Sequence, residues 1–323
     1  MKKAICCAIL LVFLSLLLLS CGGSGGSTGV GAQACYAQPG TTCQSLVFNG
    51  ATRTYRLHVP SNFQKSNSAL VIVLHGSSGN GLGMEIGTAF SKLADQAGFA
   101  VAYPDGLLDP GEGFTDWAYF FNDFTDDVGF LRQLITAVQA SAQPDPKKIY
   151  VTGLSSGALM SHRVGVQLSD LVAGIGVVEG ALFHNTTTNP PVVPPALAPV
   201  SVLVLHGDQD TTIPYCGTQN DASQEQSVNY WSGTSADSCS SFDTTAPLCD
   251  GQGNITSVLE KDATGCAANT EVKFYKLVGG MHTWYTVPMN VSGQVPFNPD
   301  FDSNTGITTT EILWNFFATH SKP

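Results

Sequence analysis

The sequence predicts an α/β fold in which helices cover both faces of a mostly parallel central sheet. Two observations support this prediction. Apolar runs of strand length alternate along the chain with stretches whose apolar residues recur at helical spacing. Several of the runs are apolar throughout, which is typical of strands buried on both faces. The chain has 323 residues, 43% of them hydrophobic, so it can bury one sizeable core and we expect one main domain.

The expected elements follow in chain order. Residues 70–74 and 99–103 form continuous apolar runs, which predict buried central strands. Between residues 125 and 142 the apolar side chains fall at three- and four-residue steps, which predicts a helix with one buried face. Further strands are expected at 148–154, 174–178, 200–205 and 271–278, and a last helix at 309–317.

The N-terminal segment has the features of an export signal. Lys2 and Lys3 precede an apolar run over residues 4–19, and Ser20 follows the run. The run is too short and wrongly flanked for a resident membrane span. We therefore expect residues 1–20 to be a signal peptide and the mature protein to be exported.

The end of this segment, Leu18-Leu19-Ser20-Cys21, resembles the bacterial lipobox, in which the cysteine becomes lipidated. Several acyl chains together hold a protein at a membrane, so we expect a cell-envelope lipoprotein whose membrane contact is this anchor. The Gly/Ser-rich residues 21–34 would then form a flexible tether to a domain over residues 35–323. An ordinary secretory signal followed by an incidental cysteine is the alternative, and it predicts a secreted protein.

The cysteines beyond Cys21 are even in number. They are Cys35, Cys43, Cys216, Cys239, Cys249 and Cys266. An even set in an exported protein predicts three disulfides. Cys35 with Cys43 is the local pair that we favour, and the pairing of the other four stays open. A zinc site is disfavoured because no pair has the two-residue spacing of a metal knuckle.

The charge balance disfavours two classes of partner. The formal charge is -11 at pH 7, and it becomes more negative once Lys2 and Lys3 leave with the signal. A protein of this charge repels phosphate backbones and anionic lipid surfaces. We therefore expect no nucleic-acid partner and no membrane contact apart from the anchor. We also expect a monomer.

The motif Gly-x-Ser-x-Gly, which can carry a nucleophilic serine, occurs three times. Ser24 and Ser27 lie in the tether, where no strand or helix would orient the hydroxyl. Ser155 instead lies between the expected strand 148–152 and the helix-like stretch 158–168, which is the context of a nucleophile elbow. The flanking glycines permit the close backbone approach that this turn needs. A bystander serine in a structural glycine turn is the alternative.

A serine hydroxyl becomes nucleophilic when a histidine, itself oriented by an acid, removes its proton. His282 follows the last expected strand, where a loop can bring an imidazole over the serine, and His184 and His320 fit the chain order of serine, acid and histidine less well. The strand before it leads into a loop with two carboxylates. We favour Asp210 as the acid and expect Asp208 to cap the turn.

Catalysis by a serine also needs hydrogen-bond donors for the oxyanion. The amide of the residue after the nucleophile supplies one, and a loop after an early strand supplies the other. These donors are expected to be the amides of Ser156 and Ser77. We expect His75 to be a substrate-binding residue of this loop, which it would also brace, rather than a proton-transfer group.

Five motifs, taken in chain order, resemble one group of the α/β-hydrolase superfamily, the polyhydroxybutyrate depolymerases and feruloyl esterases. This group is similar to carbohydrate esterase family 1. They are Leu74-His75-Gly76, Asp126-Asp127-Val128-Gly129-Phe130, Gly153-Leu154-Ser155-Ser156-Gly157, the stretch from His206 through Asp210 to Tyr215, and Gly279-Gly280-Met281-His282-Thr283-Trp284. The likeness spans residues 45–318. It implies an α/β-hydrolase fold with Ser155, Asp210 and His282 as the triad, and it implies that Trp284 lines the acyl or leaving-group cleft.

The cleft is expected to be open and partly aromatic. Its candidate lining residues are Trp117, Tyr119, Tyr215 and Trp284, although a core role is an equal alternative for the first two. Two residues depart from the family pattern, because Met281 stands where a third glycine is usual and Tyr285 where proline is common. About twenty residues separate two of the expected strands after the elbow, so we expect no large lid.

These expectations combine into a serine esterase that needs no metal or organic cofactor. The leading substrate is a short-chain hydroxyalkanoate polyester or oligomer, and the alternative is a feruloyl or acetyl ester on plant polysaccharide. A surface lipoprotein that keeps the fold only for binding is a further alternative, and a broken triad would mark it.

Overall fold

The computed structural model describes residues 38–323 with several gaps. The gaps are residue 110 and the ranges 121–124, 183–192, 219–221, 234–235, 243–258, 278 and 287–307. The expected signal peptide, the tether and the lipidated Cys21 therefore lie outside the described residues. Within the part of the chain that is described, no helix is long and apolar enough to cross a membrane.

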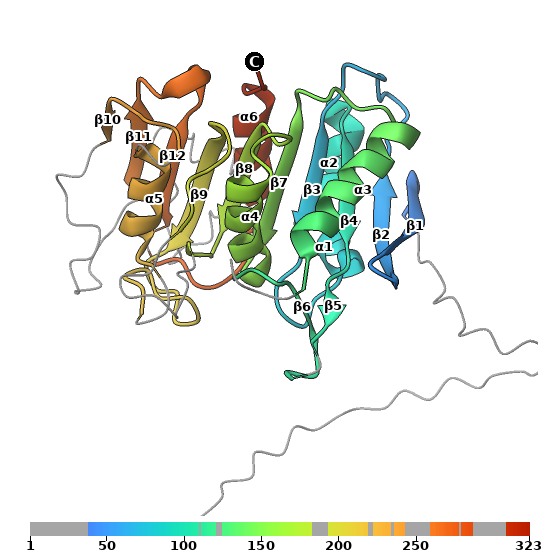
Figure 1. The fold of residues 1–323 in the computed structure, drawn as a ribbon, viewed down its shortest axis with the longest axis horizontal. Coiled ribbons are helices and arrows are strands. Elements are labelled where there is room, and N and C mark those ends of the chain that lie inside the picture. Colours follow the sequence, from blue (N-terminus) through green and yellow to red (C-terminus); the bar gives the residue numbers. More distant parts are fainter. Residues whose placement is uncertain are drawn as a thin grey trace, which may run out of the picture. The chain divides into compact units, whose positions relative to one another are not determined.

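A mixed sheet forms the centre of the structure, and ten of the described strands belong to it (Figure 1). Its strand order is β1-β2-β4-β3-β7-β8-β9-β12-β11-β10. The strands are β1 (Thr41–Phe48), β2 (Ala51–His58), β3 (Leu70–Leu74), β4 (Ala100–Pro104), β7 (Ile149–Leu154), β8 (Gly174–Val178), β9 (Ser201–Gly207), β10 (Ser241–Phe242), β11 (Leu259–Thr264) and β12 (Val272–Leu277). The central strands from β4 to β12 pair in parallel, and the outer pairs are antiparallel. The predicted mostly parallel sheet is confirmed.

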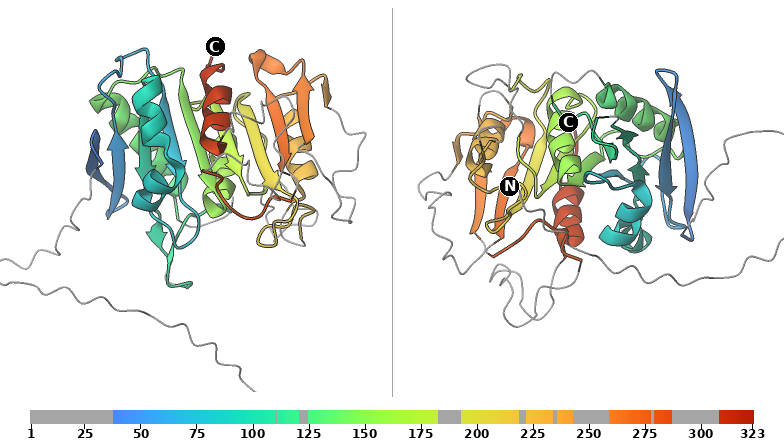
Figure 2. Two further views of the ribbon diagram at one scale, coloured as in Figure 1. Left: turned by 180° about the vertical axis from the view of Figure 1, so that it is seen from behind. Right: turned by 90° about the horizontal axis from the view of Figure 1, so that it is seen from below.

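Helices pack on both faces of this sheet, as the sequence predicts. They are α1 (Gly81–Thr88), α2 (Phe90–Ala97), α3 (Asp127–Ser141), α4 (Ser156–Gln167), α5 (Gln224–Ser232) and α6 (Thr309–Ala318). Residues of α3, α4 and α5 join one buried apolar cluster, and residues of α1, α2 and α6 join a second. Figure 2 shows α2 and α6 on the face opposite to that seen in Figure 1. A separate ribbon of β5 (Leu107–Leu108) and β6 (Thr115–Asp116) lies outside the main sheet.

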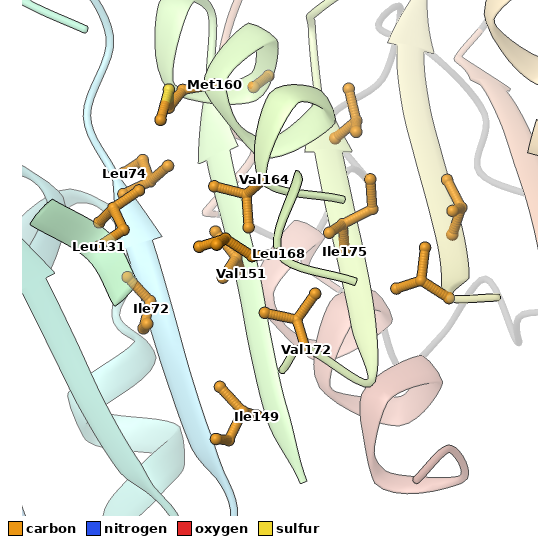
Figure 3. Close-up of a cluster of buried hydrophobic side chains, with 14 of the residues drawn as sticks. Ile72, Leu74, Leu131, Ile149, Val151, Met160, Val164, Leu168, Val172 and Ile175 are labelled. Atoms are coloured by element: carbon orange, nitrogen blue, oxygen red, sulfur yellow. The ribbon is translucent and has the colours of Figure 1, made fainter. Parts of the chain in front are cut away.

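Strand β3 illustrates why the central runs are apolar throughout. Ile72 and Leu74 join the cluster of α3, α4 and α5, whereas Val71 and Val73 join the cluster on the other face. Figure 3 shows Leu131 of α3 beside Ile72 and Leu74. Burying one such side chain fully stabilises the fold by about 1.5 to 3 kcal/mol. A polar residue at either set of positions would therefore face a core.

One disulfide has both of its cysteines in the described part of the chain, and it joins Cys239 to Cys266. Cys43 and Cys216 are also disulfide-bonded. The two remaining cysteines of the expected set, Cys35 and Cys249, lie outside the described residues. The favoured pairing of Cys35 with Cys43 therefore stays a prediction.

A buried ion pair connects the edge of the sheet with the start of α3. Arg53 of β2 places Nη1 2.7 Å from Oδ1 of Asp127, and both side chains are almost fully buried. The other oxygen of Asp127 accepts a hydrogen bond of 2.8 Å from the Ala118 amide. Asp126 instead caps α3, because its side chain accepts a 2.8 Å bond from the Gly129 amide. The two adjacent aspartates thus have different structural roles.

This difference predicts opposite outcomes for the same chemical change. Asp127→Asn leaves the buried Arg53 guanidinium without its counter-charge, so we expect the free energy of unfolding to fall by about 3 to 5 kcal/mol. Asp126→Asn keeps a good N-cap and is the matched control, with a change near zero. Urea unfolding at pH 7 measures both. A similar loss in the two variants would contradict the assigned role of the Arg53–Asp127 pair.

Candidate active site

Ser155 lies at a sharp turn between β7 and α4, where it is the N-cap of the helix and is half-buried. Its φ of 57° and ψ of -123° are unusual for a residue with a side chain, so the turn is strained. The flanking glycines are needed for close backbone approach. A Cβ on Gly157 would lie 2.5 Å from the carbonyl oxygens of Leu74 and His75, and one on Gly153 would lie 2.5 Å from the Gly157 backbone. This is the geometry expected of a nucleophile elbow.

A short hydrogen bond joins a histidine and an aspartate near the same edge of the sheet. Nδ1 of His282 lies 2.6 Å from Oδ2 of Asp210. The other oxygen of Asp210 accepts bonds of 2.7 and 2.9 Å from the amides of Thr212 and Ile213. Burial raises the pKa of Asp210, but the hydrogen bonds from His282 and Ile213 outweigh it, so the pKa lies below its ordinary value. The Asp210 side chain is therefore a buried carboxylate whose charge faces the imidazole.

Asp208, the other carboxylate on this loop, has different partners. Its Oδ1 accepts a 2.7 Å hydrogen bond from the Gly279 amide, and its Oδ2 lies 3.8 Å from Nζ of Lys276. Asp208 therefore ties the loop after β9 to the end of β12. The structure places Asp210, and not Asp208, against His282.

The order of the strands brings the three predicted residues to one edge of the sheet. Ser155 follows β7, Asp210 follows β9 and His282 follows β12, and β7, β8, β9 and β12 are neighbours in the sheet. Because these strands are parallel, their carboxyl ends meet at the same edge, which is where ligands bind in open α/β sheets.

The two expected oxyanion donors lie on segments that adjoin this serine. A Cβ on Gly76 would lie 3.2 Å from the Cβ of Ser155, so the loop that continues into Ser77 packs against the elbow. The Ser77 hydroxyl donates a 2.8 Å hydrogen bond to Asp116 of β6, which fixes this loop to the outer ribbon. The Ser156 amide lies in the first turn of α4, where amides have no acceptor within the helix.

His75 and Trp117 brace the same loop from the inside. His75 is fully buried, and its Nε2 accepts a 2.8 Å hydrogen bond from the Gly106 amide while Nδ1 donates to the Gly76 carbonyl oxygen at 2.7 Å. Burial lowers the pKa of His75, which keeps the ring neutral. Nε1 of Trp117 donates to the His75 carbonyl at 2.8 Å. Both ring nitrogens of His75 are used within the fold, so these contacts account for the side chain as a brace of the loop, and contact of His75 with substrate stays a prediction.

Two other residues expected at the cleft pack within the core. Nε1 of Trp284 donates a 3.0 Å hydrogen bond to Thr310, and its ring lies edge-on to Phe90. Tyr215 is also buried and contacts the ring of Phe274. These contacts account for both aromatic residues as packing, and contact of either with substrate stays a prediction.

A cavity of about 740 Å³ opens beside the loop of Ser77. Its walls come from the β5–β6 ribbon, the segment after it and the start of α3, and they combine rings with carboxylates: Phe114, Trp117, Tyr119, Phe120, Asp109, Glu112, Asp116 and Asp127. Trp117 and Tyr119 were expected at the cleft. The ribbon was not predicted, because strands of two residues leave no pattern in the sequence.

Part of the chain is similar to a known protein family. Residues 53–191, which include the elbow of Ser155, match the family model described as Esterase PHB depolymerase. This match covers less than half of the chain, so it shows which family the segment is similar to. Asp210 and His282 lie beyond the matched segment.

Individual relatives agree with this esterase segment. One relative is the Nocardia uniformis subsp. tsuyamanensis protein described as "Putative esterase NocK". It is 31% identical to this chain over 55% of this chain and 51% of its own length. Feruloyl esterase B of Piromyces equi is 30% identical over 53% of this chain and 32% of its own length. The chain thus spans about half or less of these relatives.

A solved structure covers more of the chain. The acetyl xylan esterase from Aspergillus awamori superposes with a TM-score of 0.54 at 18% identity, over 86% of this chain and 99% of that chain. At this identity the likeness shows the fold alone. The predicted α/β-hydrolase fold is confirmed.

Two buried residues near Asp210 were not predicted as site residues from the sequence. Glu179 directly follows β8, and His206 lies within β9; both are fully buried. Among the described residues, one nitrogen or oxygen atom from each of Glu179, His206 and Asp210 lies within 4.8 Å of the other two, so the two carboxyl groups and the imidazole are close neighbours. Burial lowers the pKa of His206 to about 4, and its Nε2 donates to the Ile213 carbonyl at 2.9 Å. A single acid after an apolar run was the only sequence signal for Glu179.

Proposed function

We propose that the chain is a serine esterase that hydrolyses carboxylic esters with Ser155 as nucleophile. The observation that carries this proposal is the 2.6 Å bond between His282 and Asp210, at the sheet edge that also holds the strained elbow of Ser155. A serine in such a turn, with an oriented histidine and a buried carboxylate, is the arrangement used for acyl transfer on this fold. The esterase family of the segment 53–191 supports the same reaction class.

The mechanism proceeds in two acyl-transfer steps. Oγ of Ser155 attacks the ester carbonyl carbon, and Nε2 of His282 takes the hydroxyl proton, because Nδ1 is already bonded to Asp210. The charge of Asp210 stabilises the imidazolium. The amides of Ser77 and Ser156 donate to the oxyanion. His282 then gives its proton to the leaving alcohol, and a water molecule, activated by the same nitrogen, releases the acid from the serine.

The leading substrate proposal is a short-chain hydroxyalkanoate polyester or oligomer, which the description of the matched family supports. A feruloyl or acetyl ester on plant polysaccharide is a second candidate. The cavity beside Ser77 favours it, because carboxylates such as Asp116 can accept hydrogen bonds from sugar hydroxyls and the rings offer stacking surfaces.

A rate comparison tests the reaction and separates the substrates. We expect the protein to hydrolyse at least one of a hydroxybutyrate trimer, methyl ferulate and an acetylated xylo-oligosaccharide, with the highest kcat/KM on the trimer. Ser155→Ala is the blank, with turnover reduced on the order of a millionfold. No hydrolysis of any ester by the wild-type protein would favour the binding lipoprotein instead. A turnover in Ser155→Ala close to that of the wild type would exclude this nucleophile.

The choice between the two loop carboxylates gives a second prediction. Asp210→Asn should lower kcat by about 10⁴-fold, because an amide no longer fixes the imidazole tautomer or stabilises its positive charge. Asp208→Asn is the matched control and should lower kcat far less, since its partners are Gly279 and Lys276. Both are measured with p-nitrophenyl butyrate after circular dichroism has established folding. Equal losses, or the reverse order, would overturn the assignment of Asp210.

We also propose that the protein is exported and held at the cell envelope through Cys21, on the strength of the lipobox-like sequence. Cys21→Ala should move active protein from the membrane fraction to the soluble fraction after cell breakage, and should remove incorporation of labelled palmitate. A wild-type protein that is already soluble would instead support an ordinary secretory signal.

A further inference from the structure

A second carboxyl group lies behind the acid of the candidate triad. We propose that Glu179 is a positioning residue, which stays a neutral acid at neutral pH and donates its carboxyl proton to Asp210, so that one negative charge is shared by the pair and faces His282. This inference rests on the proposed roles of Asp210 and His282.

The backbone fixes Glu179 between the serine and the acid loop. Its strand, β8, lies between β7 and β9 in the sheet. Val178, the residue before it, accepts a 3.1 Å hydrogen bond from the Ser155 amide, and the Glu179 amide donates a 3.0 Å bond to the Leu205 carbonyl. The φ of Glu179 is 50°, a left-handed conformation that a side chain adopts only when its surroundings hold it there. The carboxyl group is thus held in place rather than free to turn to solvent.

The hydrogen bonds show which of the two carboxyl groups keeps the charge. Asp210 accepts three N–H bonds, from His282, Thr212 and Ile213. Among the described residues, Glu179 accepts one such bond, of 2.9 Å from the Gly207 amide to Oε2, and its buried Oε1 accepts none. Oxygen atoms of the two carboxyl groups lie within 4.8 Å of each other, and two buried carboxyl groups this close cannot both ionise without strong repulsion. The proton therefore belongs on Glu179, where Oε1 has the free position, and the charge belongs on Asp210.

The other titratable groups around Glu179 supply no positive charge that would hold it ionised. His206, whose Nε2 lies 3.8 Å from Oε2 of Glu179, is neutral at pH 7 because burial lowers its pKa to about 4. Tyr285, after β12, is also neutral, since burial raises its pKa to about 12. His282 bonds to Asp210. In agreement with this environment, burial, aided by the nearby Asp210, raises the pKa of Glu179 well above its ordinary value.

A neutral Glu179 would serve the triad in two ways. Its O–H donates to the carboxylate of Asp210, which restricts the rotation of that carboxylate and keeps Oδ2 directed at His282. Its neutrality also leaves a single negative charge beside the imidazole, so the basicity of His282 is not raised by a second one. An ionised Glu179 would lose the first effect and reverse the second.

Two substitutions at this position test the positioning role. Glu179→Gln keeps a donor for Asp210 and an acceptor for the Gly207 amide, and we expect kcat on p-nitrophenyl butyrate within about threefold of wild type. Glu179→Met keeps the volume without a donor, and we expect kcat to fall by about 10- to 100-fold with KM unchanged, which is the effect of losing one hydrogen bond to a charged group. An equal fall of kcat in the two variants would overturn the proposal.

The pH dependence of stability tests the neutral state without reference to catalysis. The folded state holds the Glu179 proton above the pH at which the unfolded chain releases it, which lies near the ordinary glutamate pKa of about 4.3. The stability of the wild-type protein should therefore decline as pH rises above that value, and the Gln variant should lack this part of the decline. Urea midpoints at pH 5 and pH 8 should thus show Glu179→Gln gaining relative to wild type at pH 8.

Glu225→Gln, the same change on a half-buried glutamate of α5, is the control and should show no such gain. A Glu179→Gln effect that is equal at pH 5 and pH 8 would mean that Glu179 is ionised or merely structural, and would overturn the proposal. If instead the esterase assignment failed, all variants would lack activity while the pH-dependent gain remained. The two failures are therefore distinguishable.

Discussion

Hydrogen bonds between the parallel strands β7, β8, β9 and β12 set the register of the strands, and so determine where the carboxyl end of each strand lies relative to its neighbours. Leu154 pairs with Val178, Val178 with Leu205, and Leu205 with Tyr275, so one row of residues crosses the four strands. The elbow begins one residue beyond this row on β7. The acid loop and the histidine loop begin just beyond it on β9 and β12. A slip of one residue in any of these pairings would turn the side chains of that strand to the opposite face and separate the loops.

The strained serine depends on this register and on tight packing around it. A left-handed φ costs energy, on the order of 1 to 3 kcal/mol, and persists only where the surroundings determine it. Here the amide of Ser155 donates to Val178, and the glycines on either side allow Leu74 and the loop after it to pack directly on the turn. The strain is therefore sustained by the central strands, whose side chains are buried on both faces. The conformation of the candidate nucleophile therefore depends on the packing of the core.

The part of the fold that could be predicted is the part whose physics leaves a pattern in the sequence. Strands 70–74 and 174–178 are apolar throughout because both faces are covered, and the structure has them at the predicted bounds. The hairpin of β1 and β2 lacks this signal, since most of Thr41–Phe48 is exposed or half-exposed and its residues are mixed in character. The helices α1 and α2 were not predicted, because each has eight residues, and about two turns are too few to establish a helical period of apolar residues.

Some residues of the candidate site are indicated by the sequence, and others only by tertiary contacts. The places of Ser155, Asp210 and His282 after three strands were predictable because that chain order needs no knowledge of packing, and their catalytic roles stay a proposal. Glu179 was not predictable, because its proposed role depends on its closeness to Asp210, which lies in the loop after another strand. For Trp284 the motif predicts a place at the cleft, and its indole also packs edge-on to Phe90, a contact that the sequence did not indicate. Sequence order specifies which loops meet, and tertiary contacts decide which side chains reach the opening.

The central claim is that Asp210 and His282 activate Ser155, and covalent labelling tests it most directly. Wild-type protein would be treated with a fluorophosphonate, digested and analysed by mass spectrometry, and the rate of labelling would be followed in parallel for wild type and His282→Gln. The account predicts a single phosphonylated peptide, modified at Ser155, and a rate that falls by at least 10³-fold in the variant, the order expected when the base of a triad is lost. Modification at another serine, or an unchanged rate without the histidine, would contradict it.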